Sequence, residues 1–345
     1  MAKKIILYSL SLLCLVLLCA STSKGFMEWW CDYRVFSLKL YYTQARYGDL
    51  FTMCYLPGFN DSKGAALREY PENNSGTHLY IIHDSYLQDW LKKENFKGVD
   101  SLITSDVRNQ GIDIRIDSTK NNILVIESSE RFTGWRFRDV SLLESMLRFP
   151  SAQQAGEQPS LPEEKKIMEN FFNPNINQNL EFNLFDYECF IPLKSLKAKL
   201  NYKLFDHLSK QVCVSRDGKY LLLNETVDSS SAASSFYKTS DWEIASTTES
   251  LDKVSEYYKS KGFDKVYFTI VPNPVSIIDP TYMAYNHKIE RIFDPKKLKS
   301  EFIDIYTLFK KEKQQLYRRD DSHWNNRGVQ IFVDELNKRL SKESR

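Results

Sequence analysis

An acid–base unit is predicted near the C-terminus, in the segment RRDDSHWNNRG at residues 318–328. A histidine can act as a general base toward a weak nucleophile, and a neighbouring carboxylate can hold its imidazole in the required tautomer. His323 would be this base, and Asp321, two residues earlier, can lie on the same side of an extended or turn segment. We therefore predict that Asp321 orients His323. Asp320 is expected to face solvent, although it could replace Asp321.

The group on which this base acts is predicted to be Ser85. It follows the apolar run at residues 79–82, whose length and β-branched content indicate a buried strand. A helical pattern comes next, with Leu87, Trp90 and Leu91 on one face. A serine at such a strand-to-helix junction has the first helical N–H groups above it, where an oxyanion would form. We predict that Ser85 is a nucleophile activated by His323.

Other interpretations compete for the same residues. A serine after a strand is often only an N-cap, and an Asp-x-His sequence is often a solvated turn. His83 and Asp84 could form a local dyad with Ser85, but strand alternation directs Asp84 to the opposite side from the other two.

A metal site is the remaining chemical alternative. Asp320, Asp321 and His323 offer ligand atoms, but the chain has only five histidines and none of the others lies nearby at a metal-ligand spacing. We therefore expect neither a metal ion nor another cofactor.

The elements that must position these residues alternate along the chain, as in an α/β fold. Strands are predicted at residues 79–82, 121–127, 219–225, 265–271 and 314–319. Helices are predicted at residues 140–149, 250–262, 281–293 and 329–340, with a rigid loop at 272–280. This alternation predicts a three-layer α/β domain with a mostly parallel sheet over residues 26–345. Functional loops of such a sheet gather at the carboxyl ends of the strands, where both Ser85 and His323 are expected.

An irregular insertion is predicted at about residues 150–245. Its sequence is polar, with proline and asparagine clusters, and DSSSAASS at residues 228–235 is typical of a flexible linker. Aromatic residues in the insertion could form a sugar platform or an ordinary core: Phe171, Phe172, Phe182, Phe185 and Tyr187.

The N-terminus is typical of an exported protein. Lys3 and Lys4 precede an uncharged apolar run at residues 5–20, so we expect residues 1–25 to be a signal peptide or an N-terminal membrane anchor. Four cysteines follow this segment, and they could form disulfides in an exported protein or stay reduced: Cys31, Cys54, Cys189 and Cys213. None of them forms a C-x-x-C pair, so a zinc ribbon is not expected.

Composition limits the function classes further. The 345 residues carry a formal net charge of +2, which gives no electrostatic reason to expect nucleic acid as a partner. The hydrophobic fraction of 42 % is sufficient for a sizeable core.

Three short motifs resemble those of the SGNH/GDSL hydrolase superfamily, in particular the alginate O-acetylation proteins of exported polysaccharide acetylation. Residues 321–324 match the D-x-H-W motif of those proteins and are followed by Asn325 and Gly328. The sequence His-Asp-Ser at residues 83–85 is similar to their nucleophile segment, and IESSER at residues 126–131 is similar to a run that follows one of their strands.

The resemblance implies an SGNH-like domain with a catalytic triad of Ser85, His323 and Asp321. It implies acyl (acetyl) transfer to an extracytoplasmic polysaccharide through an acyl-serine, with a membrane-bound acyltransferase as a partner and a periplasmic location. The alternatives are a carbohydrate esterase that deacetylates a glycan with the same triad, and a non-catalytic glycan-binding or scaffold protein on a degenerate SGNH fold.

The chain also departs from the family pattern. His83 stands where the family has a glycine before the nucleophile, and the D-x-H-W motif follows the serine, whereas the alginate proteins have it first. No G-x-N-D block supplies the usual oxyanion donor. Arg131, Asn273 and Trp324 are therefore the candidates for contacting the oxyanion or the substrate. Arg131 could instead pair with Glu127, and Asn273 could be an ordinary turn residue.

Overall fold

The computed structural model describes residues 2–22, 47–61, 64–71, 76–87, 90–150, 185 and 187–343. The chain divides into two compact units. The first comprises residues 1–47, 55–57 and 156–207, and the second comprises residues 48–54, 58–155 and 208–345. The predicted boundary at residue 26 and most of the aromatic residues of the insertion lie outside the described residues.

The regular elements of the first unit, among its described residues, are helices. They are α1 (Ala2–Thr22), η3 (Glu188–Phe190) and α8 (Ile191–Phe205). The apolar run at residues 5–20 lies within α1. No helix in the described ranges is both long enough and apolar enough to cross a membrane.

The second unit is built on a five-stranded sheet in which every neighbouring pair is parallel. In spatial order the strands are β2 (Val99–Asp106), β1 (Thr77–His83), β4 (Asn121–Ser129), β8 (Lys265–Val271) and β9 (Glu301–Ile303). The predicted strands at residues 79–82, 121–127 and 265–271 are confirmed as β1, β4 and β8. The predicted α/β fold with a mostly parallel sheet is likewise confirmed.

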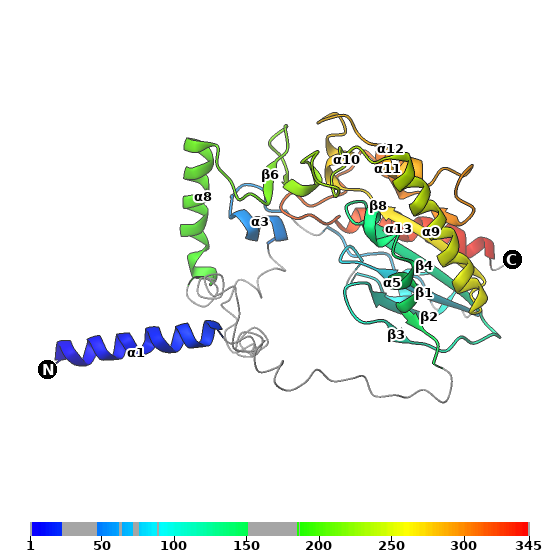
Figure 1. The fold of residues 1–345 in the computed structure, drawn as a ribbon, viewed down its shortest axis with the longest axis horizontal. Coiled ribbons are helices and arrows are strands. Elements are labelled where there is room, and N and C mark those ends of the chain that lie inside the picture. Colours follow the sequence, from blue (N-terminus) through cyan, green and yellow to red (C-terminus); the bar gives the residue numbers. More distant parts are fainter. Residues whose placement is uncertain are drawn as a thin grey trace. The chain divides into compact units, whose positions relative to one another are not determined.

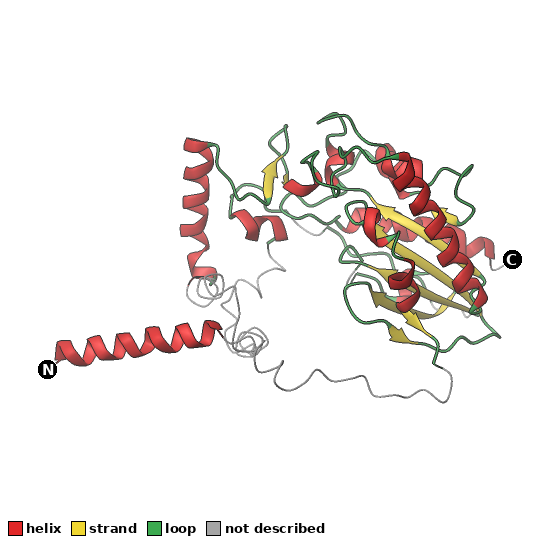
Figure 2. Ribbon diagram, in the orientation of Figure 1, coloured by secondary structure: helices red, strands yellow, loops and turns green. Residues whose placement is uncertain are grey.

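Helices cover both faces of this sheet, as Figures 1 and 2 show. They are α5 (Val140–Ser145), α9 (Asp241–Ser260), α12 (Ile305–Lys311) and α13 (Asn326–Glu343). Successive strand residues point to opposite faces. Tyr80 and Ile82 therefore pack in the core on the α5 and α9 side, while Leu79 and Ile81 pack in the core on the α12 and α13 side. The result is three layers.

The sheet order places a topological switch point between β1 and β4. The chain goes from β1 to β2 on one side and later returns to add β4 on the other side. Ligands of doubly wound sheets bind in the crevice at the carboxyl ends of the strands at such a point. Ser85 follows β1, and Arg131 follows β4, so both lie at this crevice.

The helix predicted after Ser85 is wrong. Residues 85–87 form a turn, and the next helical segment in the described residues is the single 3₁₀ turn η2 (Lys93–Asn95). The Asp84 carboxylate accepts the Tyr86 N–H at 3.0 Å, and this local bond competes with helical pairing. Leu87 still packs into the core, but from a turn.

Several other local predictions need correction. Helix α9 begins at Asp241, earlier than predicted, because Ser240 and Glu243 form a capping box. The predicted helix at residues 281–293 is reduced to α11 (Lys288–Ile292), which starts after His287 at φ 52°. The predicted strand at residues 314–319 is only a bridge between Tyr317 and Trp324.

Three segments differ in type from the predictions. The loop at residues 272–280 contains the short helix α10 (Pro274–Ile278). The strand predicted at 219–225 is β7 (Leu221–Leu223), which pairs antiparallel with β6 (Val212–Val214) outside the main sheet. The segment at residues 228–235 is no linker, because it forms turns that end in the fully buried Ser234 and Ser235.

Candidate active site

Ser85, His323 and Asp321 form a connected chain of hydrogen bonds. The Ser85 Oγ lies 2.9 Å from Nε2 of His323, and Nδ1 of His323 lies 2.7 Å from Oδ1 of Asp321. With the proton on Nδ1 donated to Asp321, Nε2 accepts the hydroxyl proton of Ser85. The three residues that the sequence predicts to act together are thus in contact, although Ser85 and His323 are 238 residues apart.

Tyr86 and Trp324 tie the two catalytic segments together. The Tyr86 hydroxyl donates to the carbonyl of Ser322 at 2.7 Å, and the Trp324 indole donates to the carbonyl of Tyr86 at 2.6 Å. Both side chains are buried. Because each segment bonds to the residue beside the other's catalytic group, the Ser85–His323 distance is held by the core. Trp324 is fully buried, so it positions the triad and is not available to substrate.

The residues that follow the D-x-H-W motif begin the last helix. The Asn325 side chain accepts the N–H groups of Arg327 at 2.9 Å and Gly328 at 3.2 Å, which caps α13. A Cβ on Gly328 would lie 2.9 Å from that of Trp324, so a larger residue would displace the motif.

A buried ion pair fixes the turn that carries Ser85. The Asp84 carboxylate bonds to Arg136 at 2.8 Å, and it also accepts the N–H and hydroxyl of Ser129 at 3.0 and 2.9 Å. Burial raises the pKa of Asp84, but the Arg136 charge and these hydrogen bonds outweigh it and give a net lowering. The structure does not form the local dyad, because the Asp84 carboxylate bonds to Arg136 and Ser129, and the His83 ring contacts the Asp84 carbonyl.

Glu127 completes this support from the end of β4. It is fully buried and accepts the Asp84 N–H at 2.8 Å. Burial, followed by the neighbouring Asp84 charge, raises the pKa of Glu127 well above its usual range. The burial of Glu127 therefore favours its neutral form.

Arg318 binds the two carboxylates of the turn at residues 319–323, which we call the histidine turn. It contacts Oδ2 of Asp321 at 2.7 Å and Oδ1 of Asp320 at 3.1 Å. The expectation that Asp320 faces solvent is wrong. Asp320 is fully buried, and its carboxylate also accepts the N–H of Gly48 at 3.0 Å. Asp320 is a structural residue of this turn.

Asp49, at the start of α3 (Asp49–Cys54), is a site residue that the sequence did not predict. Its Oδ2 lies 3.6 Å from Nδ1 of His323, and its Oδ1 accepts the N–H of Ser322 at 2.7 Å. No motif marks Asp49, because it comes from a distant segment that has no predicted element.

The charges around the triad favour a negatively charged Asp321 beside a positively charged His323. Burial lowers the pKa of His323, but the hydrogen bond that its ring donates to Asp321 and the charges of Asp321 and Asp49 outweigh this effect, so the net shift is upward. Burial raises the pKa of Asp321, but His323 and Arg318 hold it far below its usual range. This arrangement stabilises the imidazolium that forms when Ser85 loses its proton.

Arg131 lies beside the triad without a hydrogen bond to any described residue. Its guanidinium stacks over Phe132 at 4.7 Å, lies 6.0 Å from the Tyr86 ring, and approaches Glu225 only to 3.9 Å. Its side chain is only 12 % exposed. A pairing with Glu127 is not observed. Apart from the long ion pair with Glu225, the Arg131 guanidinium has donors available for an oxygen near the triad, and its charge opposes protonation of His323.

The main-chain N–H of Ser85 is a second donor, after Arg131, that could contact an oxyanion. Among the described residues, no acceptor contacts it, whereas the N–H groups of Asp84 and Tyr86 are both bonded. His83 has no positive φ, so this position has no conformational need for glycine. A histidine at this position therefore leaves the backbone before Ser85 unstrained.

Asn273 does not serve as an oxyanion donor. It is fully buried, and its amide donates to the carbonyl of Ala233 at 3.1 Å and to Ser235 Oγ at 3.0 Å. These bonds hold the serine-rich segment against the end of β8.

The chain has no significant match among protein-family models, curated proteins or solved structures.

A cavity of about 300 Å³ is lined by Arg131, although no residue of the triad lines it. Phe132 and Trp135 form part of its wall, and the buried Lys288 also lines it. The Trp135 side chain is half exposed at the cavity, which is unusual for an indole of a folded domain. Aromatic faces of this kind provide flat apolar surface beside polar groups, which suits a sugar ring.

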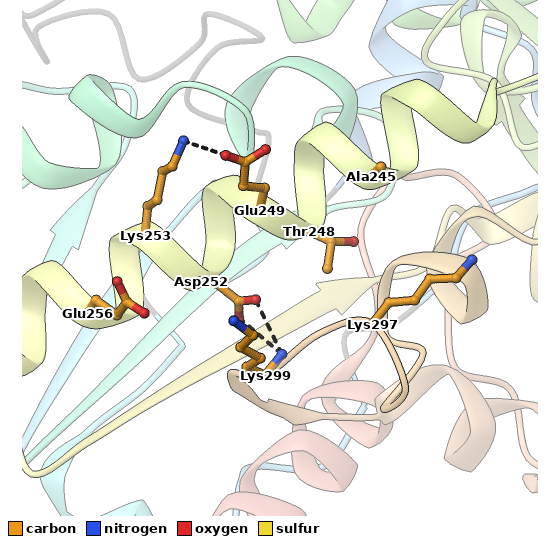
Figure 3. A pocket seen from close by; sticks show the side chains of 8 residues that line it. All are labelled: Ala245, Thr248, Glu249, Asp252, Lys253, Glu256, Lys297 and Lys299. Carbon is orange, nitrogen blue, oxygen red and sulfur yellow. Dashed lines mark hydrogen bonds and ion pairs between the residues drawn. The ribbon is translucent and has the colours of Figure 1, made fainter.

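A second concavity lies on the outer side of α9, away from these residues. Figure 3 shows that its side chains come from α9 and from Lys297 and Lys299. Its polar groups bond to one another, with Glu249 paired to Lys253 at 2.7 Å and Asp252 accepting the N–H of Lys299 at 3.1 Å. It contains no triad residue, and we assign it no role.

The candidate metal ligands in the structure differ from those predicted from the sequence, because Asp49 takes the place of Asp320. Asp49, Asp321 and His323 bring one ligand atom each within 4.8 Å of one another, whereas Asp320 is held by Arg318. Arg318 and Ser322 already donate to the two carboxylates, and His323 directs its second nitrogen to Ser85. These donors satisfy the oxygens that a cation would need.

The cysteines add no chemistry to the site. Cys189 and Cys213 are free thiols, and Cys31 lies outside the described residues. Burial raises the pKa of the Cys213 thiol to about 11, which keeps it protonated and unreactive at neutral pH.

Proposed function

We propose that the protein transfers an acyl group, such as acetyl, to a hydroxyl of an extracytoplasmic polysaccharide through an acyl-Ser85 intermediate. The observation that carries this proposal is the contact of Ser85 Oγ with His323 at 2.9 Å and of His323 with Asp321 at 2.7 Å. The resemblance of the motifs to polysaccharide acetylation proteins supports the glycan as substrate. The basic and apolar N-terminus supports a periplasmic site of action.

The chemistry proceeds in two half-reactions. His323 takes the Ser85 proton as Oγ attacks the carbonyl carbon of an ester donor, and the new Oγ–C bond leaves an oxyanion. Collapse breaks the bond to the leaving alcohol, which receives the proton from His323. A sugar hydroxyl then loses its proton to His323 as its oxygen attacks the acyl-serine carbonyl carbon. The Oγ–C bond breaks, and Ser85 Oγ takes the proton back from His323, which gives the sugar ester and free Ser85.

The oxyanion is stabilised by two donors that form no hydrogen bond with the described residues, the Ser85 N–H and the Arg131 guanidinium. The Ser85 N–H adjoins the reacting carbon once Oγ has attacked it, and the Arg131 guanidinium brings positive charge to the same end of the sheet. Donors already in place where charge develops lower the barrier without reorganisation.

Transfer requires that a sugar hydroxyl reach the acyl group before water does. The cavity beside Arg131 supports this outcome, because Trp135 and Phe132 offer a surface for a sugar ring beside the Arg131 side chain. A bound sugar gains a high effective concentration at the acyl-serine. The acyl donor would come from a membrane-bound acyltransferase.

Product partition tests transfer against the esterase alternative. The full-length protein is given an activated acetyl ester with and without an oligosaccharide acceptor, and acetate and acetylated sugar are both measured. Our proposal predicts acetylated oligosaccharide and less free acetate when the acceptor is present. Fast acetate release with no acetylated sugar identifies an esterase instead, and no turnover together with sugar binding identifies a glycan-binding scaffold.

A further inference from the structure

We propose that Asp49 is a positioning residue of the triad, which anchors the Asp321–His323 turn and places a second negative charge beside the His323 ring. This inference rests on the proposed function of Ser85 and His323. In a triad the aspartate, here Asp321, orients the histidine and stabilises its charge. We infer that Asp49 shares both tasks.

The first step is the close docking of the chain at Gly48. The Gly48 N–H donates to Oδ2 of Asp320 at 3.0 Å, and the Phe51 N–H donates to the Asp320 carbonyl at 3.0 Å. A Cβ on Gly48 would lie 2.0 Å from that carbonyl oxygen, which is too close for any other residue. The start of α3 is therefore fixed directly against the histidine turn.

The second step is the double contact that Asp49 makes with Ser322. Its Oδ1 accepts the Ser322 N–H at 2.7 Å, and its Oδ2 accepts the Ser322 hydroxyl. Ser322 separates Asp321 from His323 in the chain, so these bonds restrain both catalytic side chains. Asp49 thus restrains the turn through Ser322, while Arg318 restrains it through its ion pair with Asp321.

The third step is electrostatic. Nδ1 of His323 lies 2.7 Å from Asp321 and 3.6 Å from Asp49, so two carboxylates face one edge of the ring. The remaining groups that act on this pair are the Arg131 guanidinium, which opposes protonation of His323, and Arg318, which pairs with Asp321. Partial burial and then the Asp321 charge raise the pKa of Asp49 to about 6. Asp49 is thus ionised at neutral pH and loses its charge under mild acid.

The consequence is a triad whose base is tuned by two acids. When Asp49 is ionised, it stabilises the imidazolium that forms as Ser85 attacks. When Asp49 is protonated, His323 has only Asp321 to stabilise its charge and becomes a weaker base. The variant Asp49→Asn removes the charge, and its amide can still bond to Ser322.

The decisive measurement is the titration of His323 in the full-length protein by NMR with isotope-labelled histidine. The His323 signal is assigned by its loss in His323→Gln. We expect Asp49→Asn to lower the pKa of His323 by about one unit, as removal of an adjacent opposite charge does, and Asp49→Glu to restore part of the shift. Ser322→Ala is the matched control, because it removes the hydroxyl contact but keeps both carboxylates, so the His323 pKa should stay near that of the unmodified chain.

The rate of covalent labelling of Ser85 by a fluorophosphonate, followed against pH, gives the second readout. In Asp49→Asn, the pH range over which the labelling rate rises should move to lower pH, in parallel with the NMR titration of His323. The maximal labelling rate should also fall about tenfold or more, because a weaker base removes the proton more slowly. An unchanged His323 titration in folded Asp49→Asn overturns the electrostatic role. If the unmodified chain is not labelled at all, the proposed triad fails, but the NMR titration still decides the role of Asp49. Loss of His323 titration on addition of zinc alone would favour the metal alternative and overturn the proposal.

Discussion

Ser85 Oγ lies 2.9 Å from Nε2 of His323, and the two residues come from opposite ends of the domain. One follows the central strand β1, and the other precedes the last helix, α13. The contact is supported on both sides by buried groups, since Trp324 bonds to Tyr86 and Tyr86 bonds to Ser322. Its length is that of a hydrogen bond ready for proton transfer.

The first prediction concerns Asp321. Asp321→Asn should leave the fold intact and slow acylation of Ser85 by roughly 10⁴-fold, because an amide at this position favours the wrong imidazole tautomer. Single-turnover acylation with an activated ester measures the rate. The control is Asp113→Asn at an exposed ion pair with Arg148, which should acylate at the rate of the unmodified protein. Equal rates for the two variants would show that Asp321 has no such role.

The second prediction concerns the pH dependence of the base. His323 must be neutral to accept the Ser85 proton, so acylation should rise with pH and level off above the raised pKa of His323. The Arg131 charge opposes protonation of His323, so Arg131→Met should move this acid limb to higher pH. Removal of an oxyanion donor should also lower the plateau rate, by about 10²-fold. A limb that stays in place in Arg131→Met would separate this residue from the triad.

The third prediction concerns the buried ion pair below Ser85. Asp84→Ala leaves Arg136 without its partner in the core, and this should reduce the free energy of unfolding by about 3 kcal/mol or more. Urea denaturation measures this loss. Asp113→Ala is the exposed counterpart at Arg148 and should change the stability by less than about 1 kcal/mol. Similar losses in the two variants would mean that the Asp84–Arg136 pair contributes little.

The fourth prediction concerns Glu127. Its pKa is raised in the folded protein, so its contribution to stability is complete below the unfolded pKa and is lost as pH rises toward the folded value. Glu127→Gln keeps the neutral form at every pH. The variant should therefore match the unmodified protein near pH 4 and be more stable than it at pH 8. Thermal unfolding at both pH values measures the difference, and parallel stability curves would argue against a raised pKa of Glu127.

The residues of the proposed triad were more predictable than those that support them. Ser85, Asp321 and His323 could be predicted because each lies in a short motif beside a regular element, and parallel strands bring such junctions to one edge. The buried strands were predictable from their apolar runs. Asp49 was not, because its role depends on a contact across 273 residues of sequence. Asp320 was misplaced because a charged residue in a polar run gives no sign that Arg318 and Gly48 will bury it.

Local competition explains the errors in secondary structure. The apolar spacing after Ser85 fits a helix, but the Asp84 side chain bonds to the Tyr86 N–H and holds a turn. The serine-rich segment at residues 228–235 has the composition of a linker, but Asn273 and Asn286 bond to its carbonyls and bury its end. Side-chain contacts of this kind are not visible in periodicity or composition.

Covalent labelling of Ser85 tests the central claim most directly. The full-length protein is treated with a serine-directed fluorophosphonate at pH 8, and the modified residue is located by peptide mass analysis. We predict stoichiometric labelling of Ser85, a loss of labelling in Ser85→Ala, and strongly slowed labelling in His323→Gln, while Ser141→Ala at an exposed serine of α5 is labelled normally. Labelling of Ser85→Ala to the same extent as the unmodified protein would contradict the assignment of Ser85 as the nucleophile.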